Sequence, residues 1–294
     1  MLQSKLLFVA SSVAVLSAPS PLVAQAPPGT DIYLVEMNSS NGELRFGAVT
    51  NVTDRDGYDN QPSFLPDGSA ILYTSNRGDQ TDIYRYNIGI RSTSAVTRTS
   101  LESEYSPTVT PHGNTFTVIR VEADSTQRLW EFDLDGGNPE VVLPGIAPVG
   151  YQAWGNAFTL GIFVLGSPAT FQMADTRTGV GEIVAYNVGR SIHKIPNRHK
   201  ISFTHRVPEF WIKEIDIDSR AVRPLVRLMD SEFYAWTPDG SVITGSGSKL
   251  FRWRYVGGSE WEEVADFGNS GVENISRISV SPHGDWIAIV GTRK

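Results

Sequence analysis

The sequence predicts an all-β protein built from six repeated units, and three observations support this prediction. A Pro-x-Gly turn recurs along the chain with a period of about 43 residues once two weaker copies are included. The same order of short apolar runs flanks each turn. The two ends of the chain supply complementary parts of one unit. This period with four strands per unit is typical of a propeller blade, so we expect a six-bladed β-propeller of four-stranded antiparallel blades.

The turn residues define the repeat. Proline presets φ and glycine adopts the positive φ that a tight turn requires. The turn occurs as Pro-Asp-Gly or Pro-His-Gly at Pro66–Gly68, Pro111–Gly113, Pro238–Gly240 and Pro282–Gly284. Weaker copies at 154–156 and 196–198 occupy the gap between the second and third of these. The third and fourth units are therefore expected to depart from the pattern of the others.

Each unit contains four expected strands. In the first unit, a strand leads into the turn as "PSFLP" and a second leaves it as "AILYTS". A third strand, "DIYRYNI", alternates large apolar with polar residues, which is the period of a pleated strand. A fourth, "AVTRTS", follows. The recurring aromatic residues of the third strands are expected to pack between neighbouring blades.

The termini predict how the ring closes. The last unit reaches Lys294 after its second strand. Near the other end, "DIYLVEMN" reads as a third strand and "ELRFGAVTNVT" as a fourth. We therefore expect these N-terminal strands to complete the C-terminal blade, because closure removes two exposed sheet edges. The expected organisation is a leader at 1–26 and a single propeller at 30–294.

The first 26 residues read as an export signal. Lys5 precedes an apolar run from Leu6 to Ala18, and "VAQA" ends at Ala26 as a small-residue cleavage site. Pro27 fits cleavage poorly, so a retained N-terminal anchor that contacts the membrane is the alternative. Either reading predicts a periplasmic or otherwise extracytoplasmic protein.

Composition excludes several classes of function. The net charge is −7 and no basic run occurs, which argues against a nucleic-acid surface. The chain has no cysteine, so disulfides and thiolate chemistry are excluded. No Gly-x-Ser-x-Gly, Gly-x-Gly-x-x-Gly or Walker pattern is present. The sequence thus offers no recognisable catalytic set and predicts a protein that is not an enzyme.

One acidic stretch is a candidate metal site. "DRDGYDN" places Asp54, Asp56 and Asp59 close together, as in a calcium loop. The glycine and glutamate of an EF-hand are missing at their positions. The competing interpretation is a loop between blades whose side chains bond to local backbone. Calcium is the only cofactor that the sequence suggests.

Two further groups of residues are candidates for binding. The innermost strand of a blade lines the central channel, which predicts a lining that includes Ser63, Thr108, His193, Ala235 and Ser279. Loops between second and third strands form one rim, where partner contacts are usual. The rim candidates are Asn76, Arg77, Asp79, Glu122 and Asp124.

The stretch "YDNQPSFLPDGSAILYTSNRGDQTDIYRYNI" (58–88) resembles the TolB-type, WD-like propeller repeat, whose copies carry a Pro-Asp-Gly turn and an Ile-Tyr third strand. The resemblance covers essentially residues 30–294 and is weak in the third and fourth units. It implies a six-bladed propeller in an exported bacterial protein. It implies no reaction, because propellers host many functions.

The function predicted from these features is a non-catalytic extracytoplasmic scaffold for protein–protein interaction. Its expected partners are proteins, with a membrane-embedded complex such as a respiratory or photosynthetic assembly as one setting. Two alternatives remain open. One is a channel-site, metal-dependent hydrolase or lyase acting on a small ester or sugar. The other is a carbohydrate-binding propeller.

Overall fold

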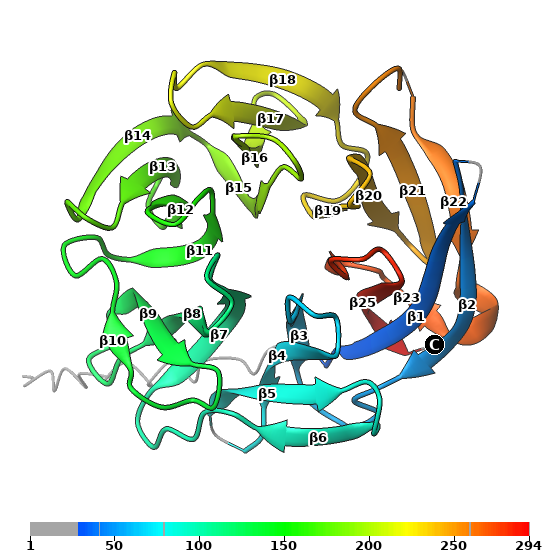
Figure 1. The fold of residues 1–294 in the computed structure, drawn as a ribbon, viewed down its shortest axis with the longest axis horizontal. Helices are drawn as coiled ribbons and strands as arrows, with labels where there is room; N and C mark the ends of the chain where they lie inside the picture. The colour runs from blue at the N-terminus through cyan, green and yellow to red at the C-terminus, as the bar shows by residue number, and fades with distance from the viewer. Residues whose placement is uncertain (1–28, 41, 79, 259, 294) are drawn as a thin grey trace, which may run out of the picture.

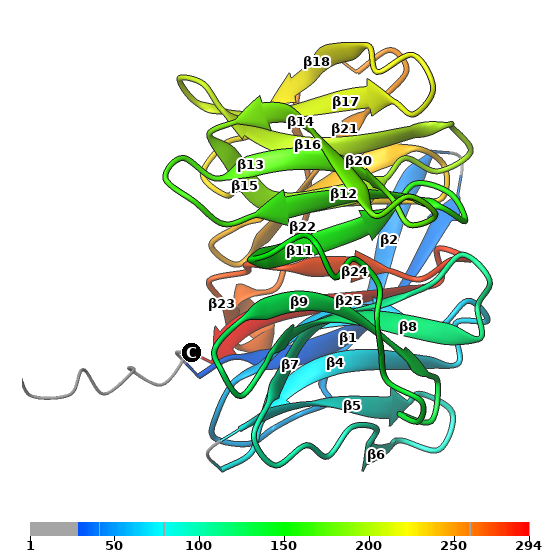
Figure 2. The same ribbon diagram turned by 90° about the vertical axis from the view of Figure 1, so that its left-hand side faces the viewer.

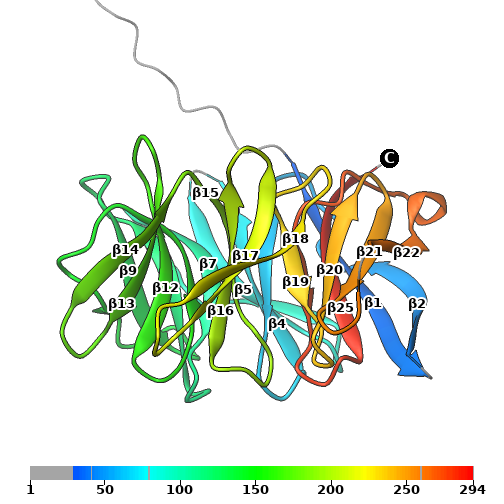
Figure 3. The same cartoon turned by 90° about the horizontal axis from the view of Figure 1, so that it is seen from above.

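The computed structural model describes residues 29–40, 42–78, 80–258 and 260–293. Six sheets stand side by side in a ring around a central channel (Figure 1). The strands of each sheet run between the two faces of the ring, as the side view shows (Figure 3). The predicted six-bladed, all-β fold is therefore confirmed. The candidate leader at 1–26 lies outside the described residues.

Five blades follow the chain without interruption, each as four antiparallel strands with the first strand innermost. Blade one contains β3 (Asp59–Phe64), β4 (Ala70–Asn76), β5 (Thr81–Asn87) and β6 (Ser92–Ala95). Blade two contains β7 (Ser103–Val109), β8 (Thr115–Val121), β9 (Gln127–Asp133) and β10 (Glu140–Val141). Blade three contains β11 (Val149–Trp154), β12 (Thr159–Val164), β13 (Thr170–Asp175) and β14 (Val180–Tyr186).

Blade four contains β15 (Val188–Lys194), β16 (Lys200–Arg206), β17 (Phe210–Asp216) and β18 (Val222–Arg227). Blade five contains β19 (Tyr234–Trp236), β20 (Ser241–Ser246), β21 (Lys249–Arg254) and β22 (Glu262–Asp266). The only helix among the described residues is the short 3-10 turn η1 (Gly268–Ser270). No helix within the described ranges has the length and apolar character required to cross a membrane.

Blade six closes the ring with both ends of the chain. The inner strands are β23 (Val272–Glu273) and β24 (Ile278–Val280), which both pair with β25 (Trp286–Arg293). The outer strands are β1 (Asp31–Ser40) and β2 (Glu43–Asn51). Strands β1 and β25 pair in antiparallel register, with Tyr33 opposite Ile289 (Figure 2). The predicted completion of the last blade by N-terminal strands is correct.

The blades divide by turn chemistry into two groups. The regular blades, one, two, five and six, have glycine at positive φ in the predicted turn, at Gly68, Gly113, Gly240 and Gly284. The irregular blades, three and four, use asparagine. Asn156 Oδ1 accepts from the backbone N–H of Thr159 at 2.8 Å, and Asn197 adopts a φ of +55°. Asparagine tolerates a positive φ better than most residues because its short polar side chain can form hydrogen bonds with the nearby backbone.

The core lies between neighbouring blades. Apolar side chains of β1 and β25 pack against those of β3 to β5, with Ile32, Val290, Ile71 and Tyr73 fully or almost fully buried. The irregular blades share a buried cluster of their own, in which Phe171 and Phe203 stack with ring centroids 4.3 Å apart. The inner strands are thereby held around the channel in a fixed arrangement.

Candidate functional site

A cavity of about 390 Å³ occupies the central channel, and every blade contributes to its walls. The structure places all five predicted channel residues in this lining: Ser63, Thr108, His193, Ala235 and Ser279. They come from five different inner strands. Their function in binding stays a prediction.

A second layer of side chains was missed by the sequence reasoning. In five blades this layer lies two residues before a predicted channel residue, and in blade three it is formed by Tyr151. Its members are Gln61, Ser106, Tyr151, Ser191, Phe233 and Arg277. Strand alternation places residues i and i+2 on one face, so this signal was present in the sequence. Bulges obscure it in blades one and two, where Gln61 and Ser106 have φ values of +57° and +55°.

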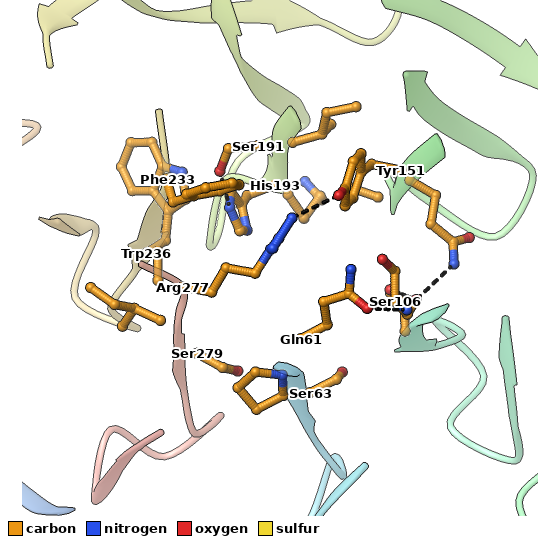
Figure 4. A pocket seen from close by; sticks show the side chains of 18 of the residues that line it. Gln61, Ser63, Ser106, Tyr151, Ser191, His193, Phe233, Trp236, Arg277 and Ser279 are labelled. Atoms are coloured by element: carbon orange, nitrogen blue, oxygen red, sulfur yellow. Dashed lines mark hydrogen bonds between the residues drawn. The ribbon is translucent and has the colours of Figure 1, made fainter. Parts of the chain in front are cut away.

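Arg277 reaches into the middle of the cavity (Figure 4). Its guanidinium donates to the Tyr151 hydroxyl at 2.8 Å and to Asn60 Oδ1 at 3.5 Å. It also lies over the ring of Phe233, 4.2 Å from the centroid. Tyr151 belongs to blade three and Arg277 precedes β24 of blade six, on the opposite side of the ring (Figure 1). The pair thus bridges the channel.

The charge of a second arginine in the lining, Arg190, is neutralised by Glu232, which does not itself line the cavity. Arg190 Nε donates to Glu232 Oε1 at 2.7 Å, and Arg206 donates to Glu232 Oε2 at 2.9 Å. Burial raises the pKa of the Glu232 carboxyl, but hydrogen bonds from Arg206 and Arg190 outweigh this, so its pKa lies below the usual value. Glu232 is 6% exposed and ionised, which fixes Arg190 at the channel wall.

His193 is uncharged at neutral pH. Burial disfavours the imidazolium and lowers the pKa of His193 to about 4. Its Nε2 lies 2.9 Å from Ser191 Oγ, and its ring meets that of Tyr234 edge-on, with centroids 4.8 Å apart. In this state the imidazole brings no positive charge to the channel.

The channel has the opposite charge to the chain as a whole. Arg190, Lys194 and Arg277 line it, whereas no aspartate or glutamate occurs among the described residues of its walls. Burial lowers the pKa of Lys194. The arrangement suits an anionic ligand, because a cavity with low-dielectric walls concentrates the field of its charges.

A neighbouring cavity of about 470 Å³ shares Gln61, Tyr151 and Arg190 with the channel. Tyr58 and Tyr105 supply two more phenols to its walls. Burial raises the pKa of Tyr58 to about 12, although Arg277 and Arg190 oppose this shift. The Tyr58 hydroxyl is therefore a neutral donor and acceptor at physiological pH.

The acidic stretch of blade one does not assemble a metal site. Asp59 is fully buried, forms an ion pair with Arg55 at 3.0 Å and accepts from Ser75 Oγ at 2.6 Å. Asp54 is exposed and faces Arg293 at 3.4 Å, and Asp56 is exposed. Within the part of the chain that the structure describes, no three histidine, aspartate or glutamate side chains gather as ligands. The stretch is an interblade loop, held by hydrogen bonds and ion pairs.

The rim candidates mostly bond within their own loops. Asn76 donates to Gln80 O at 3.0 Å, and Arg77 lies over the Tyr84 ring. Glu122 accepts from Trp130 Nε1 at 2.9 Å, and Asp124 accepts from the Thr126 N–H at 2.9 Å. Asp79 lies outside the described residues. These contacts give the loops a defined shape but leave the prediction of partner contacts untested.

Comparisons with known proteins place the fold. No protein-family model matches the chain. An uncharacterised protein of Agrobacterium fabrum is 28% identical over 119 residues, a match that spans 38% of each of the two proteins. A structure described provisionally as TolB from Agrobacterium tumefaciens superimposes with a TM-score of 0.70 at 15% identity, covering 90% of this chain and 98% of that one.

Another propeller is an enzyme. A gluconolactonase of Xanthomonas campestris superimposes with a TM-score of 0.60 at 8% identity, covering 92% of this chain and 99% of that one. Identities this low establish a common fold and carry no function with them. The chain has the six-bladed propeller fold of TolB-like proteins.

Proposed function

We propose that this protein is a non-catalytic, extracytoplasmic scaffold that binds a protein partner along the outer strand of blade three. The observation that carries the proposal is the apolar character of β14. Val180, Ile183 and Tyr186 on this strand are 64%, 48% and 55% exposed, and its only charged residue is Glu182. Its outer edge pairs with no other strand in the described structure.

The other outer strands show what is unusual about β14. Proteins protect exposed sheet edges with charges, proline or very short strands. Strand β18 carries Arg223 and Pro224, β22 begins with two glutamates, and β2 exposes Glu43 and Arg45. Strand β10 has two residues, and β6 exposes serine and threonine. Strand β14 has seven residues and none of these protections except Glu182. An extended segment of a partner is the ligand that fits such an edge.

The position of Thr30 determines which face of the ring a retained anchor would turn towards a membrane. Its N–H donates to Gly57 O at 3.0 Å, and its hydroxyl donates to Asp59 O at 2.9 Å. Asn60 joins Thr30 to Arg277, so the start of the propeller lies beside one mouth of the channel. A retained anchor at 1–26 would set this face towards the membrane. We therefore propose an extrinsic subunit of a membrane-embedded assembly in the periplasm or an equivalent compartment.

The test compares single lysine substitutions on two outer strands in the organism that makes the protein. Ile183→Lys adds a charge to β14, whereas Val222→Lys adds one to β18, where Val222 is 44% exposed. Membranes are solubilised in mild detergent and fractionated by size. We expect the wild type and Val222→Lys to comigrate stoichiometrically with a membrane complex and Ile183→Lys to be released. A wild-type protein that migrates as a free monomer contradicts the proposal.

A further inference from the structure

Arg277 is a cation in the channel without a carboxylate partner. No aspartate or glutamate occurs among the described residues of the cavity lining around it, and its hydrogen-bond acceptors are the Tyr151 hydroxyl and Asn60 Oδ1. A guanidinium has five N–H donors, so several of them remain for a ligand. A partly desolvated cation gains free energy from an anion, and its planar donors match the two oxygens of a carboxylate.

Two buried polar atoms in the same walls also lack partners. Ser106 and Gln152 are only 9% and 7% exposed, and both line the cavity. The Gln152 amide nitrogen donates to Ser106 O at 3.3 Å, but Gln152 Oε1 and Ser106 Oγ form no hydrogen bond. Neighbouring atoms close both of them off from the cavity. Because a buried polar atom without a partner is costly, a rotation of either side chain towards the cavity would gain a hydrogen bond with a hydroxyl or amide of a ligand.

Aromatic walls complete the site. The rings of Phe233 and Tyr151 flank the Arg277 guanidinium, at 4.2 and 5.1 Å from their centroids. Trp154 and Trp236 lie further along the same cavity. Such walls bind the apolar body of a small molecule or of a peptide side chain.

We propose that the channel is a binding site for an organic carboxylate. The carboxylate accepts hydrogen bonds from the free N–H groups of Arg277. A hydroxyl or amide of the ligand bonds to Ser106 Oγ or Gln152 Oε1 once that side chain rotates towards the cavity. The apolar part lies against Phe233. Two sources share this chemistry, a free hydroxy acid and the C-terminal carboxylate of a peptide. This site is independent of the proposed contact at β14, which lies on the outside of the ring.

Calorimetric titration of the whole propeller tests the site with four probes. Mandelate carries a carboxylate, a hydroxyl and a ring, and mandelamide lacks only the charge. The peptide Gly-Gly-Phe with a free C-terminus is compared with its C-terminal amide. The variant Arg277→Gln removes the cation. Arg45→Gln on the outer strand β2 is the matched control, because Arg45 has a 69% exposed side chain and lies outside the channel lining.

We expect at least one of the two acids to bind, with its amide form and the Arg277→Gln variant each weakening binding about ten- to a hundredfold, and with Arg45→Gln unchanged. The acid that binds more tightly identifies the source. Equal binding of acids and amides, unchanged binding in Arg277→Gln, or no binding of either acid at about 10 mM overturns the proposal. Arg277→Lys is the second variant should Arg277→Gln fail to fold. It retains the charge without the planar fork, so we expect a smaller loss of affinity than for glutamine.

Discussion

The regular and irregular blades differ in their turns and in the channel residues they contribute, whereas both groups bury apolar clusters between neighbouring blades. The regular blades present short side chains from their inner strands, at Ser63, Thr108, Ala235 and Ser279. The irregular blades contribute Tyr151, Arg190 and His193 to the channel and carry the apolar outer strand β14. The regular blades also supply larger side chains from the second layer, namely Gln61 from blade one, Phe233 from blade five and Arg277 from blade six.

The comparison indicates that the repeat pattern reflects the requirements of core packing and turn conformation. A blade needs apolar faces towards its neighbours and a turn that tolerates positive φ. Asparagine can adopt a positive φ in the place of glycine, as Asn197 does. The side chains that face the channel are not bound by either requirement, so polar and charged residues can differ there from blade to blade. In this protein Arg190 and His193 come from an irregular blade and Arg277 from a regular one.

The largest expected effect tests whether the irregular blades are packed as firmly as the regular ones. Phe203 in blade four and Phe116 in blade two are both fully buried and stacked on another phenylalanine. We expect Phe203→Ala and Phe116→Ala each to lower the free energy of unfolding by about 3–5 kcal/mol, because each leaves a large cavity. Urea denaturation followed by fluorescence measures both. A much smaller loss for Phe203→Ala would show that the irregular half is loosely packed.

A smaller effect is expected for two buried carboxyls, Glu104 and Glu232, whose contributions to folding stability should depend on pH with opposite signs. Burial raises the pKa of Glu104 in blade two to about 7, although Arg120 opposes the shift. The unfolded carboxyl ionises near pH 4.5, so the stability that Glu104 contributes is present below that pH and is lost as the pH rises towards 7. We expect Glu104→Gln to gain on the order of 3 kcal/mol relative to the wild type between pH 4 and pH 8.

Glu232, beside the irregular blade four, is the control with the opposite sign. Its folded pKa lies below the usual value, so its contribution is present above that value and is lost as the pH falls through the folded pKa. Glu232→Gln should therefore be most destabilising at neutral pH, where Arg190 and Arg206 lose their partner. Unfolding curves from pH 3 to 8 measure both variants, and parallel pH profiles would show that the two carboxyls do not differ in this way.

The smallest expected effect concerns the turns themselves. Gly240 has a φ of +86°, and an added Cβ would meet no atom within 4 Å, so Gly240→Ala is opposed by backbone conformation alone. We expect a loss of about 1–2 kcal/mol. Asn197→Ala in blade four should cost less, because asparagine already pays part of this conformational cost. Thermal unfolding compares the two variants. An equal loss would remove the distinction between glycine and asparagine turns.

The sequence by itself determined the architecture. The period of the turns, the alternation of the third strands and the complementary ends predicted six blades and their closure, because these features depend on local conformation and on the burial of one face per strand. The same alternation predicted that Ser63, Thr108, His193, Ala235 and Ser279 belong to inner strands, and the structure places all of them around one cavity.

Only the tertiary structure decided which charges meet and which are left without a partner. Arg277 and Tyr151 lie 126 residues apart in sequence, and their hydrogen bond exists because the ring sets blades six and three opposite each other. The three aspartates of blade one are close in sequence, yet backbone direction sends Asp59 inward and leaves Asp54 and Asp56 exposed. Pairing depends on distances across the ring, and local sequence does not encode those distances.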